Sequence, residues 1–139
     1  MGHRNYIYYQ PNQMDLKDRY GDCTIRALSK VMETDWLAAF DFTIPYCRKH
    51  QVPNIWFCPA YKRQEIFSEM GYEYHGISNK KGTKRPVVWK FAKDHPKGRY
   101  LVNVANHVVA VVDGKYYDTW DSGDKPMYGW FEPIENGEN

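Results

Sequence analysis

Residues 107–118 read HVVAVVDGKYYD, and this stretch decides the fold. Asp-Gly is a strong signal for a two-residue turn between antiparallel strands, and here apolar residues lie on both sides of it. The pattern predicts a β-hairpin with strands over residues 107–112 and 115–120, joined at Asp113 and Gly114.

The turn also fixes the register of this hairpin. It pairs Val112 with Lys115, Val111 with Tyr116, Val109 with Asp118, and His107 with Trp120. Side chains alternate between the two faces of a strand, so His107 and Asp118 share one face. They come out as diagonal neighbours, within reach of each other.

The rest of the chain divides into a helical first half and a strand-rich second half. Apolar periodicity and Pro or Gly at the boundaries predict four helices and two more strands. The helices are expected at 23–33, 36–50, 59–70 and 86–95, and the strands at 72–76 and 100–105. Residues 5–21 read as an irregular lead-in, 78–85 as a polar loop, and 122–139 as a tail that packs partly and frays. We therefore expect one α+β domain over residues 1–139, with N-terminal helices packed on a C-terminal antiparallel sheet.

Composition excludes several classes of protein. The chain has 139 residues, 42% of them hydrophobic and 26% charged, which suits one globular domain. Its net charge of +2 is small, and the basic run Lys80, Lys81, Lys84 and Arg85 reads as a solvated loop, so no nucleic-acid partner is expected. There is no apolar stretch of membrane-spanning length and no leader-like start, so we expect no membrane partner and a cytoplasmic location with reduced thiols. Most of the aromatic residues are expected to fill the core.

Cys23 is the first candidate for chemistry because it opens a predicted helix. The free N–H groups and dipole of a helix N-terminus stabilise a thiolate, the reactive form of cysteine. The neighbouring carboxylate of Asp22 opposes thiolate formation unless it points away. A buried, inert thiol is the alternative interpretation of Cys23.

His107 and Asp118 complete a nucleophile, base and orienting acid. A carboxylate beside a histidine fixes the tautomer of the ring and supports the imidazolium. Asp121 faces away in a regular strand and is the weaker orienting acid. Taken singly, His107 can be a half-buried structural histidine, and Asp118 can be a carboxylate at the edge of a turn. The hypothesis of a catalytic set therefore rests on the joint placement of Cys23, His107 and Asp118.

The other two cysteines are possible zinc ligands. Cys47 and His50 are three residues apart on a predicted helix, and Cys58 follows soon after. No fourth ligand and no Cys-x-x-Cys pair accompanies them, so core packing is the preferred interpretation and no metal is expected. Cys58 precedes Pro59, a typical first residue of a helix, and is the second choice as nucleophile.

Two segments resemble papain-like cysteine peptidases. Residues 21–28, GDCTIRAL, resemble their nucleophile helix, and residues 106–118, NHVVAVVDGKYYD, resemble their histidine hairpin. The order Cys, His, acid is also that of the superfamily. The branch stays open: Asp-Cys resembles NlpC-type amidases, Cys-x-x-Arg-Ala-Leu resembles ovarian-tumour-type deubiquitinases, and the hairpin resembles bacteriocin leader peptidases. The small size and the Asp-Cys-x-x-Arg-Ala pattern also resemble those of proteins from bacteria and their phages.

This resemblance implies a papain-like fold and a cysteine hydrolase that needs no cofactor. Cys23, His107 and Asp118 would cleave an amide through a thioester. The substrate would be a peptide or protein, including a ubiquitin-like modifier or a host protein, in the host cytoplasm if a phage encodes the chain. Trp120 and Asp121 are candidates for the substrate groove.

One position departs from the family pattern. Lys17 stands six residues before Cys23, where these enzymes usually carry a glutamine that helps to bind the oxyanion. Gln10, Asn12 and Gln13 are the upstream amides that could replace it. The departure keeps a second hypothesis open, in which the chain is a non-catalytic binding or inhibitor module on the same fold.

Overall fold

The computed structural model describes residues 3, 5–14, 21–78 and 80–134. Within them a six-stranded sheet has the order β1-β5-β4-β3-β6-β2, and its strands pair antiparallel except for the parallel pair β1 and β5. The predicted α+β class is confirmed. The strands are β1 (Tyr6–Tyr8), β2 (Tyr72–Gly76), β3 (Arg99–Val104), β4 (His107–Val112), β5 (Lys115–Asp118) and β6 (Gly129–Pro133). The helices are α1 (Cys23–Met32), α2 (Trp36–Lys49), α3 (Ala60–Glu69) and α4 (Val88–Asp94).

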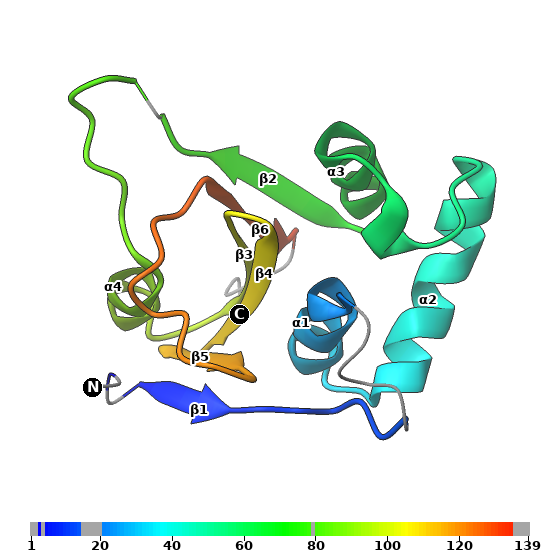
Figure 1. Ribbon diagram of the computed structural model, residues 1–139, viewed down its shortest axis with the longest axis horizontal. Coiled ribbons are helices and arrows are strands. Elements are labelled where there is room, and N and C mark those ends of the chain that lie inside the picture. Colours follow the sequence, from blue (N-terminus) through cyan, green and yellow to red (C-terminus); the bar gives the residue numbers. More distant parts are fainter. Residues whose placement is uncertain (1–2, 4, 15–20, 79, 135–139) are drawn as a thin grey trace.

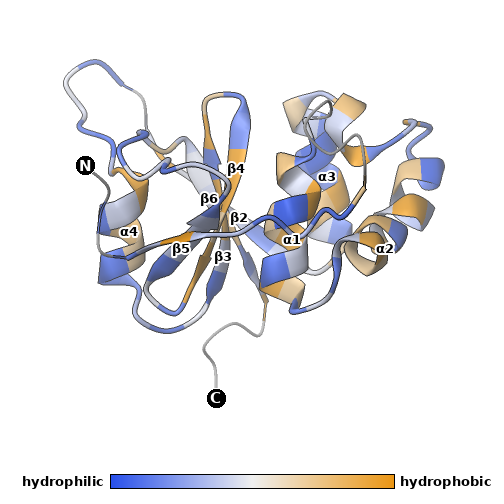
Figure 2. Ribbon diagram, turned by 60° about the horizontal axis from the view of Figure 1, so that its bottom comes forward, coloured by the Kyte–Doolittle hydropathy of each residue, from blue (hydrophilic) through white to orange (hydrophobic). Residues whose placement is uncertain are grey.

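The sheet is covered on both faces. Helices α1, α2 and α3 lie on one side of it and α4 lies on the other (Figures 1 and 2). The alternation of side chains along β4 sends Val108 and Ala110 to the core under α1, and Val109 and Val111 to the core under α4. Both faces of β4 are therefore buried, which explains why its sequence is a continuous apolar run.

The central hairpin has the predicted register near its turn. Val112 pairs with Lys115 and Val111 with Tyr116. Asp113 and Gly114 both have positive φ, of 50° and 85°, as a turn that follows the strand twist requires.

The predicted length of the second hairpin strand was wrong. β5 ends at Asp118 instead of residue 120, so the expected ladder pair of His107 with Trp120 does not form. The reason is local: the Asp118 carboxylate accepts hydrogen bonds from the backbone N–H of Thr119, at 2.8 Å, and from the Ser122 hydroxyl, at 2.7 Å. These bonds turn the chain away from the strand direction.

Two strands lie where no strand was predicted. β1 belongs to the expected irregular lead-in and pairs with β5, while β6 belongs to the expected tail and lies between β3 and β2. The tail contributes Phe131, which is 2% exposed, to the core under α1. A short 3-10 helix, η2 (Ile55–Phe57), was also not predicted.

Helix α1 follows its predicted bounds to within one residue. Ile25, Leu28 and Val31 are fully or almost fully buried and form its apolar stripe against the sheet. The helix ends because Glu33 adopts the left-handed conformation, with φ of 57°, and the N–H of Thr34 bonds back to the carbonyl of Ser29. Cys23 is thereby fixed at the start of a helix that is packed on β4.

Candidate functional site

Cys23 is the first residue of α1 and is partly exposed. It lines a cavity of about 210 Å³ together with His107, Trp56 and Arg63. A first-turn N–H has no acceptor within its own helix, so the start of α1 offers donors to a negative charge at this place. The thiol therefore lies where a substrate could reach it.

The Asp22 carboxylate does not face the Cys23 thiol. It is fully buried and accepts hydrogen bonds from Asn12 Nδ2 and Trp36 Nε1, each at 2.9 Å, and it forms an ion pair with Arg26. These three partners hold the charge of Asp22 inside the protein. The opposition to thiolate formation that the sequence suggested is thus largely removed.

His107 contacts both other members of the predicted triad. Its Nε2 donates a hydrogen bond of 2.6 Å to Asp118 Oδ2, and the ring also forms a hydrogen bond with the Cys23 thiol. Because Nε2 faces the acid, Nδ1 is the nitrogen left to exchange a proton with sulfur. The side chains of His107 and Asp118 are 10% and 2% exposed, so water screens this pair little.

Asp118 is held from several directions. Besides His107, its carboxylate accepts hydrogen bonds from Thr119 and Ser122, and the guanidinium of Arg26 lies 3.8 Å from Oδ1. Its backbone carbonyl accepts bonds from the N–H of Tyr9, at 2.9 Å, and the hydroxyl of Tyr6, at 3.1 Å. The acid can therefore orient the imidazole without moving itself.

The electrostatics of the Cys23–His107 pair favour charge separation. Burial raises the pKa of the Cys23 thiol, but the hydrogen bond and charge of His107, the backbone N–H of Val108 and the charge of Arg26 together lower it below its usual value. Burial opposes protonation of His107, but the hydrogen bonds with Asp118 and Cys23 raise its pKa to about 9. A thiolate–imidazolium pair is the state that these shifts favour.

The oxyanion candidates have other contacts. Asn12 is buried and its amide bonds to Asp22 and to the N–H of Met14, while Gln10 Oε1 accepts from the N–H of Asn12. Gln13 is exposed, and Lys17 lies outside the described residues. The donors that contact the thiol itself are the His107 ring and the backbone N–H of Val108.

The two groove candidates differ in their contacts. The ring of Trp120 lies 5.0 Å from that of His107 and is 43% exposed, so it forms an open wall next to the base. Asp121 binds the Tyr116 hydroxyl and the backbone N–H groups of Gly123 and His3. Asp121 therefore holds the chain after β5 rather than contacting His107.

Sequence reasoning missed Arg26, Ser122 and Arg63 as residues of this site. Arg26 is one helical turn after Asp22, and its acid–base spacing of i to i+4 was a readable signal. Ser122 and Arg63 come from the tail and from α3, and only the tertiary arrangement brings them to the site.

The other two thiols lie in the core. Cys47 is 1% and Cys58 is 6% exposed, and burial raises the pKa of both, so neither has the features of a nucleophile. His50 does not join them as a ligand set, because its ring pairs with Glu69 at 3.0 Å. All three cysteines of the chain are free.

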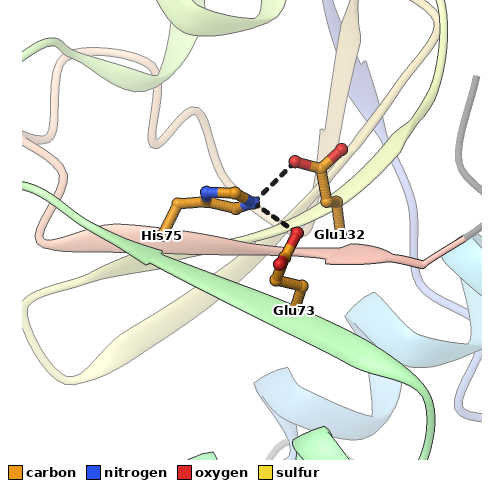
Figure 3. Close-up of side chains that lie close together, drawn as sticks. All are labelled: Glu73, His75 and Glu132. Atoms are coloured by element: carbon orange, nitrogen blue, oxygen red, sulfur yellow. Dashed lines mark ion pairs between the residues drawn. The ribbon is translucent and has the colours of Figure 1, made fainter.

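A second cluster of titratable groups lies on the edge strand β2 and its neighbour β6 (Figure 3). His75 Nε2 is 2.8 Å from a carboxylate oxygen of Glu132 and 3.3 Å from one of Glu73, and the three possible ligand atoms lie within 4.8 Å of one another. Glu73 and Glu132 pair directly across the two strands. The imidazole of His75 thus lies between two carboxylates of neighbouring strands.

Three comparisons with known proteins found no match: no protein-family model, no curated protein and no solved structure matches this chain. The described residues include no helix with the length and apolar character needed to cross a membrane.

Proposed function

We propose that this chain is a papain-like thiol hydrolase that cleaves an amide bond with Cys23 as nucleophile, His107 as base and Asp118 as orienting acid. The observation that carries the proposal is the continuous hydrogen-bonded series from the thiol through the imidazole to a buried carboxylate. A series of this kind supplies an activated nucleophile next to a group that can return a proton.

The reaction begins from the thiolate–imidazolium pair. The Cys23 thiolate attacks the carbonyl carbon of the amide, and the carbonyl oxygen takes the negative charge of a tetrahedral intermediate. When the intermediate collapses, the C–N bond breaks, and His107 gives its proton to the departing amine. A thioester on Cys23 and a neutral imidazole remain.

Water then completes the cycle. Neutral His107 takes a proton from the water that attacks the thioester, and a second tetrahedral intermediate forms. Its collapse breaks the C–S bond, releases the acid, and restores the thiolate beside the imidazolium. Asp118 keeps the ring oriented through both halves of the reaction and supports its charged form.

The surroundings of Cys23 favour a peptide or protein as substrate. Beyond the cavity at Cys23, a second hollow of about 290 Å³ shares Trp56 with it and is lined by Asn12, Met14, Trp36, Leu37 and Phe40. Its walls are mainly apolar, and such a surface suits an apolar side chain of an extended peptide. The N–H of Cys23 is the oxyanion donor that we assign to the reaction.

A cysteine-directed activity probe tests the nucleophile. We expect labelling of the intact protein at one site, abolished in Cys23→Ala and strongly reduced in His107→Ala. Cys58→Ala is the matched control, because this thiol is buried and should leave labelling unchanged. Labelling that persists in Cys23→Ala would refute the assignment.

Peptide cleavage tests the reaction itself. A proteome-derived peptide mixture incubated with the protein should yield new termini, read by mass spectrometry, that are absent with Cys23→Ala. If the protein is labelled by the probe but produces no new peptide termini, the hydrolysis of peptides is contradicted.

Binding without catalysis is the second candidate function. The observation in its favour is that Asn12 is buried and its Nδ2 donates to the Asp22 carboxylate, so this amide is used within the chain and not at Cys23. Cys23→Ser separates the two functions, because a binding module keeps its biological effect in this variant and a hydrolase loses it.

A further inference from the structure

A second cavity also borders His107. It has a volume of about 300 Å³ and is lined by residues of β2, β3, β6, α3 and the loops near them. It shares Arg63, Asn106 and His107 with the cavity at Cys23. The two cavities therefore meet at the base of the candidate triad, with Arg63 on the wall of each.

Arg63 is a half-buried cation without a counter-ion among the described residues. Its neighbour on α3, Lys62, pairs with Glu65 at 3.4 Å, and that glutamate also lies 3.7 Å from His50. Of the acids on this helix, Glu69 pairs with Lys49 and His50. The acids of α3 are thus used by other cations, while the guanidinium of Arg63 stays available to a ligand.

The same cavity has a second polar group without a partner. Asn103 lines its wall from β3, and the Oδ1 atom of this side chain is buried without a hydrogen-bond partner. Tyr74, Tyr128 and Phe131 supply aromatic walls beside these two polar groups. The cavity therefore combines the Arg63 cation, the Asn103 acceptor and three aromatic rings, so it can bind a polar group of a ligand.

We propose that the cavity beside His107 is a substrate subsite in which Arg63 binds a carboxylate located next to the amide bond that is cleaved. This inference rests on the proposed function, because it names the substrate of the same site. Arg63 presents several N–H donors in a planar fork, which matches a carboxylate and allows two parallel hydrogen bonds. The volume suits a single residue, so the carboxylate belongs to an acidic side chain or to a chain end.

The experiment compares two reagents that alkylate the same thiol. Iodoacetate carries a carboxylate and iodoacetamide a neutral amide, and mass spectrometry of the Cys23 peptide measures each rate. The ratio of the two rates cancels any effect of Arg63 on thiol reactivity itself. We expect the iodoacetate-to-iodoacetamide ratio to fall about tenfold in Arg63→Gln, the loss expected for one charge-assisted hydrogen bond.

Two further variants complete the design. Arg48→Gln removes the same charge from an exposed position on α2 and should leave the ratio unchanged. Arg63→Lys keeps the charge and should restore most of the ratio, and thermal unfolding verifies that each variant is folded. An equal ratio in wild type and Arg63→Gln would overturn the subsite. A low rate of Cys23 alkylation by iodoacetamide in wild type would instead contradict the activated thiol. Failure of the subsite and failure of the proposed function therefore give different results.

Discussion

At the scale of single residues, Arg26 links two buried carboxylates of the candidate site. Its guanidinium pairs with Asp22 and lies 3.8 Å from Asp118, and its side chain is 13% exposed. It thus balances two buried carboxylates, one next to Cys23 in the chain and one in contact with His107. Arg26 touches no reacting atom and acts as a positioning residue that ties α1 to the end of β5.

Removing Arg26 should therefore weaken the fold and the site together. In Arg26→Gln, Asp22 stays buried without its counter-ion, and we expect the free energy of unfolding to fall by about 3 kcal/mol. Urea unfolding measures this loss. The double variant Asp22→Asn, Arg26→Gln removes both charges and should recover part of the stability. A double variant as unstable as the single one would show that the charge of Asp22 is not the cause.

The contact between Asp118 and His107 leads to a prediction about the pH dependence of Cys23 alkylation. Burial opposes protonation of this ring, and the hydrogen bond with Asp118 is the largest influence that raises its pKa towards about 9. In Asp118→Asn the pKa of His107 should fall, the imidazolium should be less populated, and the pKa of Cys23 should rise. The rate of alkylation by iodoacetamide near pH 6 should then drop about tenfold, since one pKa unit corresponds to tenfold.

Asp121→Asn is the matched control for this measurement. Asp121 is also an acid near the end of β5, but it binds Tyr116, Gly123 and His3. The pH profile of Cys23 alkylation in Asp121→Asn should follow that of wild type. If this profile shifts equally in Asp118→Asn and Asp121→Asn, a specific role of Asp118 is contradicted.

At the scale of elements, the hairpin of β4 and β5 carries two members of the candidate triad. Its turn depends on Gly114, whose φ of 85° an L side chain rarely adopts, and an added Cβ would lie 3.4 Å from Cα of Pro96. Gly114→Ala should reduce the free energy of unfolding by about 1 kcal/mol because of the positive φ. Chemical denaturation measures the change.

Gly21→Ala serves as the control for this substitution. An added Cβ at Gly21 meets nothing within 4 Å, so stability should be almost unchanged. A neutral Gly114→Ala would mean that the turn does not need the left-handed conformation.

Elements whose contacts are local could be predicted from the sequence. Helix α1 and the hairpin turn follow from periodicity and from Asp-Gly, and the neighbourhood of His107 and Asp118 follows from the register over a separation of 11 residues. β1 and β6 could not be predicted, because their partners are distant along the chain and nothing in a short segment specifies a distant partner. For the same reason Arg63 and Asn103, from α3 and β3, could not be assigned to the candidate site.

At the scale of the whole molecule, one sheet supports two separate cores. The core under α1 includes Leu101 and the core under α4 includes Val102, which are neighbours on β3. The cavities at the candidate site lie on the side of α1 and α3, where η2 and β2 complete their walls. The geometry of the site therefore depends on how α3 and β2 are held against the central strands.

The position of β6 in the sheet determines when β2 and α3 can be fixed against the central strands. β6 lies between β3 and β2, yet it follows both of them along the chain. During synthesis on a ribosome, β2 emerges early and has no neighbouring strand in the sheet until residues 129–133 have been translated. Because β2 and α3 pack together, the part of the proposed Arg63 subsite that β2 contributes stays incomplete over the same interval. A nascent chain would thus expose Cys23 well before the walls of both cavities are complete, so the order of synthesis would delay the hydrolysis that we propose.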